Sequence, residues 1–140
     1  MKNKNVLKMV VLLLIGGMTY FCIEMLWRGY SHISMFFVGG ICFIGIGAIN
    51  EYFPWTLGIV QQSIIGACFV TFMELASGCV LNLKLGLNVW DYSNMPFNLW
   101  GQICLPFFFA WIALSAVAII VDDYLRYWLF DEERPHYQLI

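Results

Sequence analysis

Two glutamates, Glu24 and Glu74, lie inside long runs of apolar residues. An ionisable side chain near the centre of a bilayer costs at least ~2.5–3.5 kcal/mol, so such residues usually line a cavity or meet a partner. Arg28 follows Glu24 by four residues, the order that favours an ion pair on a helix. This pair could simply neutralise itself, whereas no basic residue lies within a turn of Glu74. A protonatable acid facing a cavity is suited to proton-coupled transport or to cation binding.

The segment before the last apolar run adds polar and aromatic candidates. Trp90 and Tyr92 could form the walls of a lid over the cavity. Alternatively, this segment could lie on the lipid headgroups, with Asp91 as a turn former. Asn98 and Gln102 are four residues apart, so a helix over them would place both amides on one face. The candidate solute-binding residues are therefore Glu24, Arg28, Glu74, Trp90, Asp91, Tyr92, Asn98 and Gln102.

Four long apolar stretches must position these residues. Hydrophobic residues make up 61% of the 140 residues and charged residues 11%, whereas soluble domains carry about 25% charged residues. A hydrocarbon core of roughly 30 Å needs about 20 helical residues. The sequence predicts an all-α polytopic membrane protein, a single domain of four transmembrane helices. We expect helices at residues 6–27, 33–49, 55–80 and 99–121, an interfacial extension at 122–130 and a polar tail at 131–140.

Composition also excludes several functions. The formal net charge of −2 is too small to argue for nucleic acid as a partner. The P-loop motif is absent, so the chain does not hydrolyse nucleotides by that route. The five cysteines are scattered singly and suit small core positions, and there are only two histidines. We therefore expect no metal and no cofactor.

The basic residues predict the orientation in the membrane. Three lysines precede or open the first helix and two arginines follow the fourth, whereas the two opposite connections hold one basic residue each. The positive-inside rule then places both termini in the cytoplasm and the loop at 81–98 outside. We expect a multi-pass protein of the cell membrane. The residues used are Lys2, Lys4, Lys8, Arg126 and Arg134 against Arg28 and Lys84.

The sequence also contains an internal similarity. Residues 15–24 and 65–74 both begin with Ile-Gly and a small residue and end in glutamate. Residues 39–43 (GGICF) and 101–105 (GQICL) also match each other, although chance among apolar residues is an alternative explanation. The pattern predicts two helical hairpins related as a parallel repeat about an axis along the membrane normal. That repeat would place Glu24 and Glu74 at equal depth in the outer half of the membrane.

Several short motifs carry a family resemblance. They are the run at 24–28, the glycine pair at 39–40, Glu74 with Gly78 and Asn82, and the loop motifs WDYS at 90–93, PFN at 96–98 and GQIC at 101–104. With them the chain resembles the ABC-transporter type IV (CmpB-like) permease family of small multi-pass membrane proteins, over residues 20–114. The resemblance implies a multi-pass membrane protein, with an ATPase or other membrane subunits as candidate partners.

Three functions are consistent with these observations. The first is a transporter or permease component that binds a small polar or cationic solute in an outward-facing polar cavity. The second is a membrane enzyme acting on a lipid or its headgroup, with Glu74 and Asp91 as acid and base. The third is a non-catalytic membrane scaffold or regulatory subunit. An acyl chain in the cavity would favour the enzyme, a compact polar molecule the transporter, and a cavity filled by side chains the scaffold.

Four short helices enclose little volume, so we expect contact with membrane lipid and at least a homodimer. No strict GxxxG motif is present, and the packing between copies would then use dispersed small residues. The residues expected there are Gly39, Gly40, Gly45 and Gly47.

The orientation can be tested with one introduced cysteine. Ser93→Cys in a cysteine-free background should react with a membrane-impermeant maleimide added outside intact cells, because the loop at 81–98 is predicted to be external. Labelling of this variant only in inverted vesicles would reverse the orientation.

Overall fold

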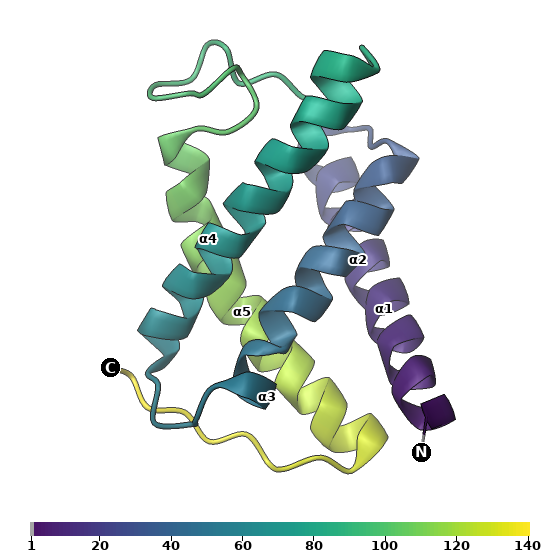
Figure 1. The fold of residues 1–140 in the computed structure, drawn as a ribbon, viewed down its shortest axis with the longest axis vertical. Coiled ribbons are helices and arrows are strands. Elements are labelled where there is room, and N and C mark those ends of the chain that lie inside the picture. Colours follow the sequence, from purple (N-terminus) through teal and green to yellow (C-terminus); the bar gives the residue numbers. More distant parts are fainter. Residues whose placement is uncertain (1) are drawn as a thin grey trace.

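The computed structural model describes residues 2–140, and all of its regular elements there are helices (Figure 1). Four helices are long and apolar enough to cross a membrane, which confirms the predicted fold class. They are α1 (Lys2–Arg28), α2 (Ile33–Gly47) taken together with the short helix after it, α4 (Ile59–Gly78) and α5 (Leu105–Phe130). A short helix α3 (Ile49–Tyr52) follows α2, and α4 runs on as the π-helix η1 (Cys79–Lys84).

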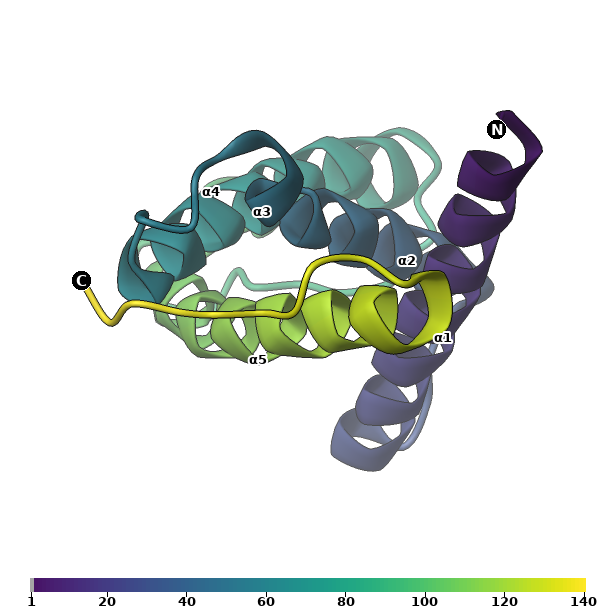
Figure 2. The ribbon, with the colours of Figure 1, turned by 90° about the horizontal axis from the view of Figure 1, so that it is seen from below.

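The helices form two antiparallel hairpins. Helix α1 packs on α2, α4 packs on α5, and α2 joins the hairpins by contacting both α4 and α5. Both chain ends lie at one end of the bundle, and the loops at 29–32 and 85–104 lie at the other (Figure 1). Seen from the end that holds the termini, α1 lies at the edge of the bundle, beyond α2 (Figure 2).

Glycines allow α1 and α2 to pack closely. A Cβ at Gly17 would lie 2.5 Å from the carbonyl oxygen of Phe36, and one at Gly40 would lie 2.7 Å from that of Leu13. These contacts run in both directions, from each helix onto the backbone of the other. In lipid, where apolar attraction between helices is weak, such close backbone approach is a main source of helix association.

The glycines that we assigned to contacts between copies are used inside the chain. Gly39 and Gly40 face α1, Gly45 faces the ring of Phe69, and Gly47 faces the carboxyl group of Asp122. That assignment was therefore wrong. The physical reason is that two hairpins in one chain already need the close approach that a dimer would have used.

The last helix begins later than predicted, at Leu105 instead of 99. Trp100 and Gly101 have positive φ values of 53° and 68°, which a right-handed helix does not accept. Pro106 then occupies the first turn of α5, where its missing N–H costs nothing. Asn98 and Gln102 consequently lie in a loop and share no helix face, which corrects the sequence prediction.

The other helix ends differ in smaller ways. Helix α4 begins at Ile59 instead of 55, because residues 54–58 form a turn after Pro54. Helix α5 runs without a break through residues 122–130 and ends at Phe130. It ends where Asp131 takes a left-handed conformation with a φ of 55°.

The internal similarity joins segments of different local structure in its second half. Residues 39–43 lie inside α2, whereas residues 101–104 precede α5 in a loop. The first half pairs helix with helix, since residues 15–24 belong to α1 and 65–74 to α4. The parallel repeat stays a prediction.

The glycine contacts give a stability prediction. Gly40→Val should push α1 away from α2 and cost roughly 1–3 kcal/mol, the usual range for overpacking, because its Cβ meets the backbone of α1. Thermal unfolding of the purified protein in detergent measures this. The control is Ala110→Val, an exposed position on α5, which should melt like the wild type. Equal melting of Gly40→Val and the wild type would contradict the close packing of this hairpin.

Candidate functional site

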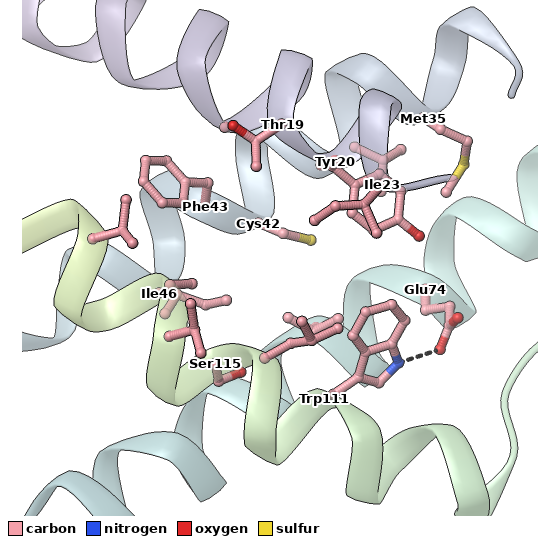
Figure 3. Close-up of a pocket in the computed structure, with 18 of the residues that line it drawn as sticks. Thr19, Tyr20, Ile23, Met35, Cys42, Phe43, Ile46, Glu74, Trp111 and Ser115 are labelled. Atoms are coloured by element: carbon pink, nitrogen blue, oxygen red, sulfur yellow. Dashed lines mark hydrogen bonds between the residues drawn. The ribbon is translucent and has the colours of Figure 1, made fainter. Parts of the chain in front are cut away.

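A cavity of about 170 Å³ lies between α1, α2, α4 and α5. Figure 3 shows side chains from these four helices pointing into it. Most of its walls are aliphatic or aromatic. Among the described residues that line it, Glu74 carries the one carboxyl group.

Glu74 is held by two neutral donors. The Tyr92 hydroxyl donates to Oε1 at 2.7 Å. The Trp111 indole N–H donates to Oε2 at 3.1 Å, the bond drawn in Figure 3. Burial and the nearby Glu74 raise the pKa of the Tyr92 phenol, so Tyr92 keeps the proton that it donates. The Glu74 side chain is only 8% exposed, and no lysine, arginine or histidine of residues 2–140 pairs with it. Each carboxyl oxygen therefore keeps lone-pair capacity for a ligand.

Aromatic rings surround this end of the cavity. Tyr20 and Trp111 both line it, with ring centroids 6.3 Å apart. Trp90 also lines it, and its ring lies against Gly78, one helical turn after Glu74. The cavity thus has an aromatic end at Glu74. Its other walls are mainly aliphatic, from residues such as Ile15, Ile46, Val70, Leu114, Ala118 and Val121.

The predicted pair of Glu24 and Arg28 is formed. The Arg28 guanidinium donates to Glu24 Oε1 at 2.6 Å, and the Ser31 hydroxyl donates to Oε2 at 2.5 Å. The other arm of Arg28 donates to the carbonyl oxygen of Val89 at 2.9 Å. The pair therefore ties α1 to the long loop and does not line the cavity.

Gln102 belongs to the same network at the base of that loop. Its amide oxygen accepts from Asn82 Nδ2 at 2.8 Å, and its backbone carbonyl accepts from the Trp90 indole at 2.9 Å. Asn82 Oδ1 accepts from the Val89 amide at 2.7 Å. Val89 and Trp90 are only 4% and 7% exposed, so this loop covers the end of the cavity.

Asp91 and Asn98 shape the loop from its exposed side. Asp91 accepts from the amide of Ser93 at 2.9 Å and from its hydroxyl, and these bonds lower the pKa of the Asp91 carboxyl. Asn98 donates to the carbonyl oxygen of Met95 at 2.9 Å and accepts from the Gly101 amide at 3.1 Å. Neither residue lines the cavity.

The eight sequence candidates therefore separate into three groups. Glu74 and Trp90 line the cavity, and Tyr92 reaches it through Glu74. Glu24, Arg28 and Gln102 form the network that holds the loop. Asp91 and Asn98 are exposed. The polar residues at the loop end pair with one another across the helix ends instead of lining an open polar cavity. We call them the loop network, which consists of Glu24, Arg28, Ser31, Asn82 and Gln102.

Sequence reasoning missed a second buried cluster, at the end of the bundle that holds the termini. Asp122 is fully buried, Arg126 is 2% exposed, and the two form an ion pair on α5. Arg126 also pairs with Glu51. Lys8 lies 2.9 Å from Glu51 and 2.7 Å from Glu132. This terminal network joins α1, α3, α5 and the tail. Its signal in the sequence was the acid-first spacing of Asp122 and Arg126.

The tail packs over this end of the bundle. The Tyr137 hydroxyl and Asn50 Nδ2 donate to Asp123 at 2.9 Å and 2.6 Å. Burial and the Asp123 carboxylate raise the pKa of the Tyr137 phenol. The carbonyl oxygen of Gln138 accepts from the Ile59 amide at 2.8 Å, which satisfies a free N–H at the start of α4.

The comparison with known proteins assigns the family. The sequence profile of the family described as "Putative ABC-transporter type IV" matches residues 11–134 of the 140. The chain belongs to this family. No curated protein and no solved structure matches the chain. Four apolar helices fit an ABC-transporter-like membrane protein, and within residues 2–140 no group of three histidine, cysteine or acidic side chains could hold a metal.

The loop network gives a further prediction. Asn82→Ala removes the acceptor of Val89 and the donor to Gln102, so the loop should loosen and the free energy of unfolding should fall by roughly 1–3 kcal/mol. Cys104 is only 5% exposed, at the end of the loop. In proteins that keep Cys104 as their single cysteine, its labelling by a maleimide should be at least tenfold faster with Asn82→Ala than without it. Asn94→Ala, at an exposed loop position, is the control. Unchanged labelling in Asn82→Ala would show that the loop is held elsewhere.

Proposed function

We propose that this chain is the membrane-spanning component of a transporter and that it binds its solute at Glu74. The supporting observation is a carboxyl group that lines a cavity inside the bundle and meets only neutral donors. In contrast, Glu24 and Asp122 each have an arginine partner. Asp123 also meets neutral donors, but it lies at the end that holds the termini and does not line this cavity. A carboxyl group kept at membrane depth without an internal cation is the arrangement expected of a solute site.

The geometry supports the cationic form of the predicted solute. The cavity walls are mainly apolar, so a strongly hydrated polar solute would lose its water there without replacement bonds. A cation would pair with Glu74 and could lie against the rings of Tyr20, Trp90 and Trp111. The proposed site is therefore the cavity, and the long loop held by the loop network covers one end of it.

Energy for transport would come from a partner. The chain has no P-loop, and the family description makes an ATPase subunit the natural candidate. We also propose that the chain assembles as a homodimer or with other membrane subunits, through exposed apolar faces such as that of α1. The end that holds the termini, with Lys8 and Glu51, would then face the cytoplasm.

The two alternative functions have less support. An enzyme using Glu74 and Asp91 as acid and base would need both groups at one substrate, but Asp91 is exposed and bound to Ser93. A scaffold would need no interior space, whereas this bundle encloses a cavity.

A substitution at Glu74 tests the solute site. Glu74→Gln keeps the side-chain shape but cannot carry a charge. Its amide oxygen can still accept from the Trp111 indole N–H, and its NH2 group can donate to the Tyr92 hydroxyl oxygen. Cells that carry this variant should show the same small-molecule and lipid profile, by untargeted mass spectrometry of cells and medium, as cells lacking the protein. We expect at least a tenfold change in one or more compounds relative to the wild type.

The control is Ala113→Leu, an exposed position on α5 outside the cavity, which should reproduce the wild-type profile. Purified Glu74→Gln should melt within a few degrees of the wild type, because no buried cation loses its partner. A wild-type profile in the Glu74→Gln cells would refute Glu74 as the solute site. A folded amount too low to compare would instead indicate a structural role.

A further inference from the structure

Building on the proposed site, we infer that the solute is an amphiphilic ammonium compound that reaches Glu74 from the lipid, through an opening between α1 and α5. The compound would carry a quaternary or protonated amine on one alkyl chain or ring. Three features of the cavity support this: its carboxyl end, its apolar walls and the position of its opening.

The carboxyl end is suited to an ammonium group. Tyr20, Trp90 and Trp111 line the cavity where Glu74 enters it, and aromatic faces near a carboxylate are the usual surroundings of a bound ammonium group. An anion would be repelled there. The nearest guanidinium in the network, that of Arg28, is already bound to Glu24 and to Val89.

The walls are suited to a hydrocarbon body. Beyond the aromatic end the cavity is bounded mainly by aliphatic side chains, including Ile46, Val70 and Ala118. The volume of about 170 Å³ is close to that of an engineered apolar cavity of about 150 Å³ that binds benzene. The space therefore accepts one short chain or one ring, and it is too small for both chains of a phospholipid.

The opening of the cavity faces the membrane. On α1, Thr19 and Ile23 line the cavity and are also exposed. On α5 the same is true of Leu114, Val117 and Val121. Both stretches lie within candidate membrane spans, so the exposed edge between them meets lipid.

The water-facing routes are covered. The loop residues Val89 and Trp90 close the end of the cavity near the long loop. They are held there by Arg28, Asn82 and Gln102 of the loop network. The terminal network of Asp122, Arg126 and Glu51 closes the other end, where Arg126 is 2% exposed. A solute that arrives through lipid needs neither end to open, and a hydrocarbon body gives it the necessary solubility in the bilayer.

Binding of defined probes tests the inference. Purified protein in nanodiscs of an uncharged galactolipid is titrated by calorimetry with hexyltrimethylammonium, and empty nanodiscs are subtracted. Hexyl sulfate has the same chain with an anionic head, hexanol has an uncharged head, and tetramethylammonium has the head alone. Hexyltrimethylammonium should bind at least tenfold more tightly than each of the three.

Two variants separate the head from the chain. Glu74→Gln should weaken hexyltrimethylammonium at least tenfold, which corresponds to about 1.4 kcal/mol, and leave hexanol unchanged. Ala118→Leu fills the cavity and should weaken every probe that carries a chain. Ala113→Leu makes the same change at an exposed position on the same helix and should bind like the wild type.

Each contrary result has a distinct meaning. Tetramethylammonium binding as tightly as hexyltrimethylammonium, with no effect of Ala118→Leu, would overturn the amphiphile and leave Glu74 as a cation site. Equal binding of hexanol or hexyl sulfate, with no effect of Glu74→Gln, would overturn the ammonium head. No binding of any probe, together with an altered profile in Glu74→Gln cells, would overturn this inference alone. An unaltered profile in those cells would overturn the proposed function itself.

Discussion

A polar group that a helix carries into lipid must find its partner inside the chain, because the hydrocarbon core offers neither water nor another donor. The structure meets this constraint at both ends of the bundle. At the end that holds the long loop, Glu24 pairs with Arg28 and Ser31, and at the end that holds the termini, Arg126 pairs with Asp122 and Glu51. Glu74 lies between these networks, lines the cavity and meets neutral donors only, which is why we propose it as the solute site.

The same constraint accounts for the cavity. Lipid gives helices little reason to associate through apolar contact alone, so they pack where glycines let backbones approach or where polar groups join them. Helix α1 packs on α2 through glycines, and polar groups tie its ends elsewhere, Lys8 to Glu51 on α3 and Arg28 to the carbonyl oxygen of Val89. It has no comparable contact with α5 along its middle. The two helices therefore remain apart there, and the cavity opens between them.

Local patterns predicted what depends on neighbours in the chain. The four apolar runs gave four helices, and the spacing of Glu24 and Arg28 gave their ion pair. The same spacing failed for Asn98 and Gln102, because positive φ values at Trp100 and Gly101 end any helix there. The same spacing also joins Asp122 and Arg126, but we expected these residues in the interfacial extension and did not consider them a buried pair. They lie on α5, which runs to Phe130.

The sequence by itself determined that the chain spans a membrane with four helices and that Glu74 needs a partner from another segment. Both follow from the cost of placing polar groups in hydrocarbon, which each residue incurs wherever the helix packs. Only the tertiary structure decided that this partner is a pair of neutral donors, Tyr92 and Trp111, and that the cavity walls are apolar. Those facts depend on which helix faces meet across the bundle. Trp111 is 37 positions from Glu74 in the chain, and the cavity walls come from residues between Ile15 and Val121.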